Sequence, residues 1–530
     1  MDQRSRETER RPRAPLLYPF ALAIFPTLSL AVSNRGENIR PGDLVLPVAI
    51  CLWVALVTWL IAGRITSSSH RRALITLAVI GWFGYYGILV RALAAFGPTS
   101  ILAQNRFALP VSLALMLLAC RTALRWNGNL VGFSRIMNRV AVLLLLFQPV
   151  RYLSASRPPD LVWEPSYALP EPLRRSAGSL PDIYYIVLDA YTGSQSLAAN
   201  YDFDNSEFEA FLRSRGFFVP RDSHSNYVTT FLALASALNW QYLDLLPKSL
   251  GEGSRDRTIP YRMIADNRTT RFLKALGYRV VFFPTAYGAT AHNAHADELV
   301  PAGDSGQPEV QTEFRSVWLA TTALRPLLVW GCLVTKCASN PFPFHPESPE
   351  LVLWKFAQLG GLPSSSPGPK FVFAHLLVPH EPYVLRADCS AKPLYWPEDG
   401  GWEEDDAMRA GYVEQVQCVN RQISLLVDRL LKDSRTPPVI ILQADHGNGR
   451  FPFGRPPSLD EITPEQLADR ISVFAAYHVP GTAAEFHDSI TPVNALPAVL
   501  RAYFGAPIPP LPDRTYYSSW RAPYRFLQVR

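Results

Sequence analysis

The sequence predicts an all-α transmembrane bundle of about five helices, followed by an α/β/α sandwich domain. Roughly the first 150 of the 530 residues are largely apolar, whereas the remainder has the composition of a water-soluble protein. In that remainder, short apolar runs rich in β-branched residues alternate with helix-like stretches. Such alternation is typical of a mostly parallel sheet covered on both faces. A chain of this length is also too long for one ordinary domain.

Five apolar segments follow a basic N-terminal tail, residues 1–14, and lie within residues 15–153. A membrane-spanning helix needs about 20 mostly apolar residues. The segments are Pro15–Ser33, Leu44–Ala62, Ala73–Val90, Phe107–Leu124 and Ile136–Leu153. The last two contain proline and arginine, so whether they cross stays open. A cleaved signal peptide is the alternative for the first segment, but no clear small-residue cleavage site accompanies it.

Arginines gather in the N-terminal tail, after the second segment and between the fourth and fifth segments, whereas the alternate loops hold few. Cytoplasmic loops are enriched in Lys and Arg. The pattern therefore predicts a multi-pass protein of a bacterial-type cytoplasmic membrane, with everything after the last span on the extracytoplasmic side. The net charge of +6 is explained by this orientation signal, and we expect no nucleic-acid partner. The oligomeric state is not determined by the sequence.

A proline-rich linker, residues 154–180, leads to the outer domain, residues 181–530. The expected strands there are IYYIVL, RVVFFP, KFVFAHLL, PPVIILQ and ISVFAAYHV. The expected helices include SEFEAFLRSRG, TRFLKALG and YVEQVQCVNRQISLLVDRLLKD. The apolar segment Val317–Val334 contains Arg325-Pro326, which disfavours a sixth span. We expect a helix pair on the membrane surface or beneath the rim of the active site.

Four cysteines lie in the outer domain, which allows three pairings. We expect Cys332–Cys337 and Cys389–Cys418, because the members of each pair are close in sequence. Disulfides are consistent with an oxidising compartment outside the cytoplasm. Four buried free thiols are the alternative.

Acidic and imidazole side chains follow two of the expected strands. Asp189 ends IYYIVL, and Asp445-His446 ends VIILQA. Open α/β sheets build their sites beyond the carboxyl ends of the strands. Asp and His together suit a divalent ion such as Zn, Mn or Mg. The following Gly447 is expected to let the backbone turn sharply and to present both side chains to one point.

A third chemistry-bearing stretch is SNYVTTFLALASALN, residues 225–239, in which Thr229 and Thr230 open an expected helix. Free N–H groups at a helix N-terminus hold anions, and a bound cation activates a hydroxyl as a nucleophile. A simple threonine N-cap is the alternative reading.

These three pieces, in this order, resemble the sulfatase-like branch of the alkaline phosphatase superfamily. The nearest resemblance is to the lipoteichoic acid synthase and phosphoglycerol transferase type of membrane protein. It covers about residues 181–520 and is carried by YIVLDAY, SNYVTTFLALASALN, FVFAHLLVPHEPY and VIILQADHG. The fold implied is an alkaline-phosphatase-like α/β/α sandwich.

The resemblance implies that Asp189, Asp445 and His446 are metal ligands. It implies that Thr230 is both a ligand and the nucleophile, with Thr229 as the alternative nucleophile. One divalent ion (Mn, Zn or Mg) is expected, and a second is left open.

Substrate contacts are also implied by the resemblance. His380 resembles a substrate-phosphate histidine that stabilises charge or protonates the leaving group, and His375 is its alternative. His292, His295 and Arg450 are further candidates, for which a place in a surface loop is the alternative.

The activity implied is transfer of a lipid-derived phospho-group, phosphoglycerol or phosphoethanolamine, from a membrane lipid to an envelope glycan or lipid. Sulfate-ester hydrolysis is disfavoured, because no C/S-x-P-x-R sequence follows Asn226. Two alternatives remain: an ester hydrolase acting on soluble substrates, and a non-catalytic membrane scaffold that retains the fold.

Overall fold

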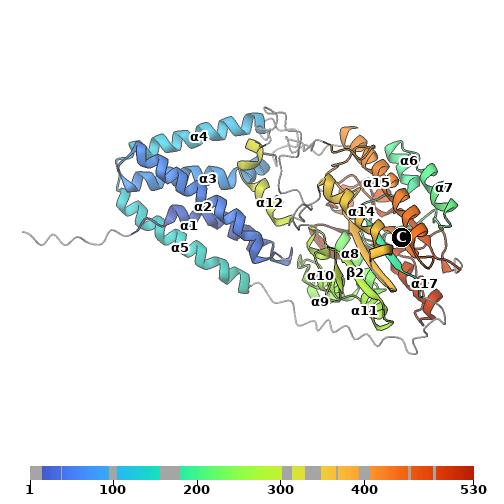
Figure 1. Ribbon diagram of the computed structural model, residues 1–530. Helices are drawn as coiled ribbons and strands as arrows, with labels where there is room; N and C mark the ends of the chain where they lie inside the picture. Colours follow the sequence, from blue (N-terminus) through green and yellow to red (C-terminus); the bar gives the residue numbers. More distant parts are fainter. Residues whose placement is uncertain are drawn as a thin grey trace, which may run out of the picture.

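The computed structural model describes residues 15–37, 39–94, 104–154, 180–300, 313–328, 348–365, 368–392, 406–451, 455–481 and 485–530. The predicted basic tail and nearly all of the predicted linker lie outside these residues. The described chain has two parts, a helical bundle and an α/β domain, which lie side by side in Figure 1.

Five helices form the bundle, close to the predicted segments. They are α1 (Tyr18–Ser33), α2 (Pro41–Ile65), α3 (Ser69–Ala94), α4 (Asn105–Arg125) and α5 (Leu130–Ser154). Among the described helices, α2 to α5 are long and apolar enough to cross a membrane. Helix α1 has 16 residues, which corresponds to about 24 Å at 1.5 Å per residue. Apolar side chains such as Val45, Leu115 and Leu143 are more than half exposed on the bundle surface, as lipid-facing residues are.

The two ends of the bundle differ in charge. At one end, the α2–α3 and α4–α5 connections meet, where Arg71 donates to the carbonyl oxygen of Trp126 at 3.4 Å. Arg64, Arg71, Arg72 and Arg125 lie at or beside these two connections. At the other end, the α1–α2 connection contacts the α/β domain, and Glu37 and Asp43 there offset Arg35 and Arg40. Since basic connections stay in the cytoplasm, this arrangement puts the α/β domain on the extracytoplasmic side.

The α/β domain is built on a sheet with the strand order β3-β2-β4-β1-β5-β6 in the described residues. These strands are β1 (Ile183–Leu188), β2 (Arg279–Phe283), β3 (Glu298–Leu299), β4 (Lys370–Leu376), β5 (Val439–Ala444) and β6 (Ala475–His478). All neighbours pair in parallel except β6, which is antiparallel to β5. The register sets Leu188 beside both Leu376 and Ala444, so three strands end at the same level.

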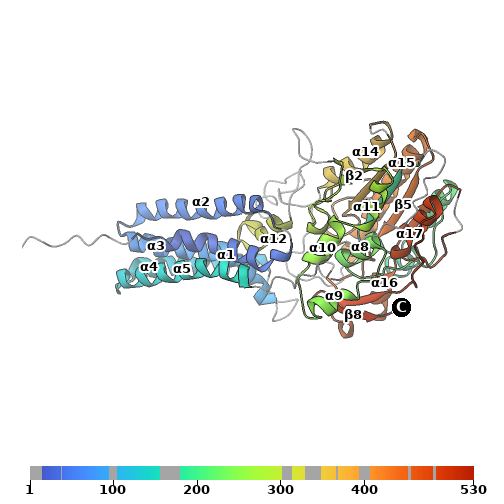
Figure 2. The same cartoon turned by 90° about the horizontal axis from the view of Figure 1, so that it is seen from below.

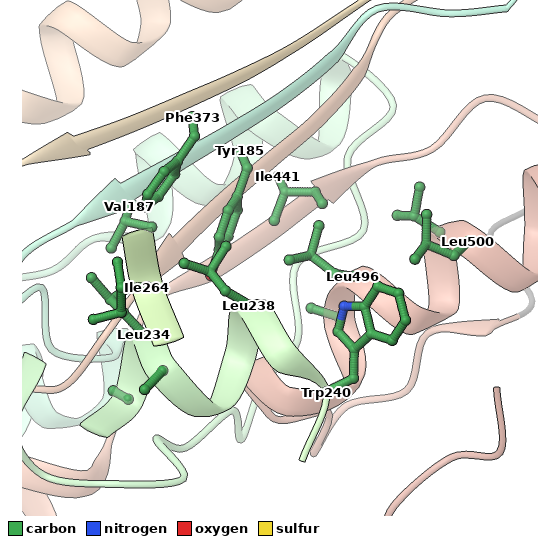
Figure 3. Packing of buried hydrophobic residues seen from close by; sticks show 14 of the residues in the cluster. Tyr185, Val187, Leu234, Leu238, Trp240, Ile264, Phe373, Ile441, Leu496 and Leu500 are labelled. Carbon is green, nitrogen blue, oxygen red and sulfur yellow. The ribbon is translucent and has the colours of Figure 1, made fainter. Parts of the chain in front are cut away.

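Helices cover both faces of this sheet, which confirms the predicted α/β/α fold class. One face carries α8 (Thr230–Asn239), α10 (Thr258–Ala265), α11 (Arg268–Ala275) and α17 (Pro492–Phe504). The other carries α6 (Ser194–Tyr201), α7 (Ser206–Ser214), α14 (Pro349–Ser365) and α15 (Asp406–Asp433). Figure 3 shows Tyr185 and Ile441 of the sheet facing Leu238 and Leu496 of the covering helices. The strands are buried on both faces, which explains why they read as continuous apolar runs.

Further elements of the described domain include α9 (Leu245–Leu250), α16 (Pro464–Ile471), and the hairpin of β7 (Tyr516–Ser519) and β8 (Ala522–Gln528). Cys389 and Cys418 form a disulfide with a Cα–Cα distance of 5.1 Å, as predicted. The other predicted pair, Cys332–Cys337, lies outside the described residues.

The apolar segment Val317–Val334 is described as far as residue 328. Its start belongs to α12 (Glu313–Thr321), which packs against the bundle. The indole of Trp318 donates to the hydroxyl of Thr27 at 3.0 Å. Gly87 of α3 permits this packing, because a Cβ there would lie 2.0 Å from the carbonyl oxygen of Ala320. Figures 1 and 2 both show α12 at the end of the bundle that is nearer to the α/β domain.

Candidate active site

The carboxyl ends of three neighbouring strands bring together Asp189, His375 and Asp445. Asp189 and Asp445 directly follow β1 and β5, and His375 is the penultimate residue of β4, which pairs with β1. All three side chains are buried, and one ligand atom from each lies within 4.8 Å of the others. Nε2 of His375 is 3.4 Å from Oδ2 of Asp189.

The polar atoms of this cluster fit a cation. Oδ1 of Asp445 accepts from the backbone N–H groups of Ala190 (3.1 Å) and His446 (2.9 Å). Within the described residues, Oδ2 of Asp445, Oδ1 of Asp189 and Nε2 of His375 are buried without a hydrogen-bond partner. Leaving three convergent polar atoms unpaired in a protein interior is costly. A divalent ion with a mixed carboxylate and imidazole shell satisfies all three at once.

His446 lies at the edge of this cluster and points the same way. Its Nδ1 is 3.0 Å from the carbonyl oxygen of Gly447, which only accepts, so the proton is on Nδ1. The lone pair of Nε2 therefore faces Thr230 Oγ1 (3.1 Å), Asp445 Oδ2 (3.4 Å) and Asp189 Oδ1 (3.7 Å). Asp189, Thr230, Asp445 and His446, the four residues expected from the sequence to be ligands, therefore lie close together in the fold.

Thr230 is the first residue of α8, and Thr229 occupies the N-cap position. Thr229 makes no side-chain cap bond, and within the described residues its buried hydroxyl has no hydrogen-bond partner. Thr230 is partly exposed. Its hydroxyl lies beside the N–H groups of the first helical turn, which favour an anion.

The electrostatics of the cluster also favour a cation. Burial opposes ionisation of Asp189, but the nearby imidazoles, His380 first, outweigh it and hold its pKa below the usual range. Burial and the charge of Asp189 raise the pKa of Asp445 to about 6. Burial and Arg470 hold the pKa of His446 well below its usual range, so its imidazole is neutral, as a metal ligand must be.

His380 lies near this cluster, on the loop after β4. Its ring centroid is 6.3 Å from that of His446. Nδ1 donates to the carbonyl oxygen of Glu381 at 2.6 Å, which leaves Nε2 for other contacts. Burial lowers the pKa of His380, but Asp189 and Glu381 outweigh it and raise the pKa overall. The buried Gln415 holds the loop by donating to the carbonyl oxygen of His380 at 3.0 Å.

From the sequence, His375 was the alternative to His380 as a histidine that contacts the substrate phosphate. Its position beside Asp189 and Asp445 suits a metal ligand instead. Its Nδ1 lies 3.0 Å from the hydroxyl of Thr290, which also contacts the hydroxyl of Thr285 at 2.7 Å. Such outer partners orient the imidazoles of metal sites. No local signal pointed to this role, because His375 lies within the apolar run KFVFAHLL.

The remaining substrate candidates are not members of the buried group of Asp189, His375 and Asp445. His295 Nε2 is paired with Asp266 at 2.7 Å, on the surface of the domain. His292 is exposed. The guanidinium Nε of Arg450 is 3.9 Å from Asp469 Oδ2.

Arg470 is a site residue that the sequence did not reveal. It is fully buried at the end of α16, and its Nη2 is 3.4 Å from Nε2 of His446. It donates to the carbonyl oxygens of Val228 (2.9 Å), Gly447 (3.1 Å) and Asn448 (3.0 Å). It therefore ties the loop after β5 to the segment that leads into α8.

Gly447 has a different role from the one expected. Its φ is not positive, so it supplies no left-handed turn. A Cβ at this position would lie 1.9 Å from the carbonyl oxygen of Asp469 and 2.5 Å from that of Ser472. Glycine is required there because two backbone segments approach closely.

No protein-family model matches the chain, and no curated protein matches it. Among solved structures it is similar to the C-terminal periplasmic domain of EptC from Escherichia coli in complex with Zn, with a TM-score of 0.40 and 11% identity, over 68% of this chain and 95% of that one. It is also similar to the phosphonate monoester hydrolase of Agrobacterium radiobacter, with a TM-score of 0.39 and 13% identity, over 64% and 80% of the two chains. A third is the periplasmic domain of the phosphoethanolamine transferase EptC from Campylobacter jejuni, with a TM-score of 0.37 and 11% identity, over 61% and 89%. These values by themselves assign neither a substrate nor a reaction.

Proposed function

We propose that the chain is a metal-dependent enzyme that transfers or hydrolyses phosphoesters, with Thr230 as its nucleophile. The observation that carries this proposal is the position of the Thr230 hydroxyl. It stands at the N-terminus of α8, 3.1 Å from Nε2 of His446 and beside the buried cluster of carboxylates and imidazoles. A hydroxyl at a helix N-terminus next to a cation site suits attack on a phosphate.

Asp189, His375, Asp445 and His446 would hold the ion. Two carboxylates and two imidazoles favour Zn or Mn over Mg, which prefers oxygen ligands. When bound there, a divalent cation lowers the pKa of the Thr230 hydroxyl and offsets the charge of the phosphate. One ion accounts for the unpaired atoms of this cluster, and a second is not required by them.

The protein groups carry the remaining steps. The hydroxyl of Thr230 loses its proton to solvent, its oxygen attacks phosphorus and forms a phosphothreonine, and the bond from phosphorus to the leaving oxygen breaks. His380, whose raised pKa favours the protonated form, donates a proton to that oxygen from Nε2. An acceptor hydroxyl or a water then gives its proton to the now neutral His380 and attacks phosphorus, while the bond from phosphorus to the Thr230 oxygen breaks and that oxygen takes up a proton from solvent. The first-turn N–H groups of α8 favour the developing negative charge.

The bundle supports a membrane substrate. We propose that the domain lies outside a bacterial-type cytoplasmic membrane and takes a phosphoglycerol or phosphoethanolamine group from a lipid donor, with an envelope glycan or lipid as acceptor. Hydrolysis of soluble phosphodiesters is the second candidate, since Thr230 is partly exposed. A non-catalytic scaffold is disfavoured by three buried, convergent polar atoms that lack partners in the described chain.

The test compares Thr230→Ala with Thr229→Ala in the full chain, purified with its metal. Thr230→Ala is expected to lose at least about a thousandfold in turnover, because no other group replaces a nucleophile. Thr229→Ala should keep most of its activity. Mass spectrometry of a trapped intermediate should find the added phospho-group on the peptide that contains Thr230. Full activity of a folded Thr230→Ala variant would refute the covalent mechanism.

A further inference from the structure

The loop between α1 and α2 reaches from the bundle to the α/β domain. It contains the 3₁₀ turn η1 (Arg35–Glu37). One carboxylate oxygen of Glu37 accepts from Nη1 of Arg257 at 2.6 Å, and the other accepts from the hydroxyl of Tyr261 at 2.5 Å. The side chain of Arg257 is only 8% exposed. Loss of Glu37 would leave a buried positive charge without its counter-charge, so breaking this contact costs free energy.

Arg257 and Tyr261 are packed against the segment that carries the nucleophile. The guanidinium carbon of Arg257 lies 4.9 Å from the ring centroid of Phe231 and 3.8 Å from that of Trp520. The ring of Tyr261 meets Phe231 edge to face, with centroids 6.3 Å apart. Phe231 directly follows Thr230 in α8. Both partners of Glu37 therefore contact Phe231, the residue next to the proposed nucleophile.

A second line of contacts leads to the metal cluster. Tyr261 also packs edge to face on Tyr287, with centroids 5.9 Å apart. Tyr287 in turn lies 6.3 Å from the ring of His375. The next residue, Gly288, faces the backbone of Glu37, and a Cβ there would lie 2.8 Å from the Glu37 carbonyl oxygen. These two series of contacts place the active-site edge of the sheet, where the carboxyl ends of the strands lie, on the side of the domain that faces the bundle. Figures 1 and 2 show α8 and α10 on that side.

We propose that Glu37 is a positioning residue that docks the active-site edge of the α/β domain onto the outer end of the bundle, so that a phosphodiester lipid still embedded in the bilayer reaches Thr230. The lipid part of this inference rests on the proposed function, whereas the docking part rests on the contacts alone.

The docking part is tested without any activity measurement, by hydrogen–deuterium exchange of the full chain in phospholipid nanodiscs. Glu37→Gln and the milder Tyr261→Phe are compared with Glu209→Gln. Glu209 pairs with Arg213 within α7, so it is a matched Glu–Arg control. Glu37→Gln and Tyr261→Phe should speed exchange of the peptide that covers α10, and the control should not. Unchanged exchange in both variants would overturn the docking.

The lipid part is tested with two substrates and the same variants. Phosphatidylglycerol or phosphatidylethanolamine in vesicles reports on a membrane-embedded diester, and bis(4-nitrophenyl) phosphate reports on a soluble one. Glu37→Gln should lower kcat/KM for the lipid about tenfold, the size of one lost charge-assisted contact, and leave the soluble diester within about twofold. Equal losses on both substrates, or no loss on the lipid, would overturn the lipid role. If the parent protein turns over neither diester, the proposed function and the lipid role fail together, and the exchange result still decides the docking.

Discussion

Replacing Gly447 by alanine tests whether close backbone packing sets the geometry of the site. A Cβ there would lie 1.9 Å from the carbonyl oxygen of Asp469, whereas ordinary contact starts at 3.4 Å. One of the two segments must therefore move by about 1.5 Å. A shift of Gly447 would displace His446 and Arg470 directly. The carbonyl oxygen of Gly447 accepts hydrogen bonds from Nδ1 of His446 (3.0 Å) and from Nη1 of Arg470 (3.1 Å).

Two magnitudes follow from this displacement. Overpacking of a well-packed interior costs about 1–3 kcal/mol and occasionally more. A misplacement of about 1 Å at a reacting group can cost about a hundredfold in rate. We therefore expect Gly447→Ala to lower the melting temperature and to weaken zinc or manganese binding by more than tenfold.

The assay is metal titration followed by calorimetry on the purified full chain. Gly361→Ala is the matched control, because nothing lies within 4 Å of a Cβ at that position in α14. An alanine in a helix interior is favoured over glycine by about 0.5–1 kcal/mol, so the control should be neutral or slightly stabilising. A Gly447→Ala protein that binds metal and melts like the parent would refute the reasoning.

Two further predictions concern residues around the site and the core. Thr290→Val removes the hydroxyl that orients His375, and metal affinity measured by competition with a chelator should fall about 10–100-fold; unchanged affinity would argue against His375 as a ligand. Burial, with a contribution from Arg530, lowers the pKa of the buried His224 to about 4. As the pH falls from about 6.5 to 4, the unfolded chain takes up a proton that the folded chain does not, so stability should drop by about 3 kcal/mol. His224→Gln should lack this drop in thermal melts at pH 7 and pH 4.5, and an equal drop in both proteins would contradict the assignment.

Much of the fold could be predicted from local patterns. The β-branched apolar runs located the main strands of the sheet, and the glycine that follows a basic turn in FLKALG marked the end of α11. These signals are local, because periodicity and capping act over a few residues. The hairpin of β7 and β8 was not predicted.

The candidate site was predicted only in part. Asp189, Asp445 and His446 were identified because a polar residue after a buried strand is locally visible. Arg470 was missed, because it ends a short polar helix that resembles any surface helix. Its burial comes from contacts with segments more than 20 residues away in the chain, and one of them is 242 residues away.

By itself, the sequence determined which segments form the main strands of the sheet, which segments are apolar enough to cross a membrane and which residue types stand at the strand ends. Only the tertiary structure decided that β4 lies between β1 and β2, which places His375 against Asp189 although 186 positions separate them. It also decided that Glu37 of the bundle meets Arg257. The physical reason is that strand order and docking depend on hydrogen bonds and packing between distant segments, which leave no periodic trace in the sequence of either one.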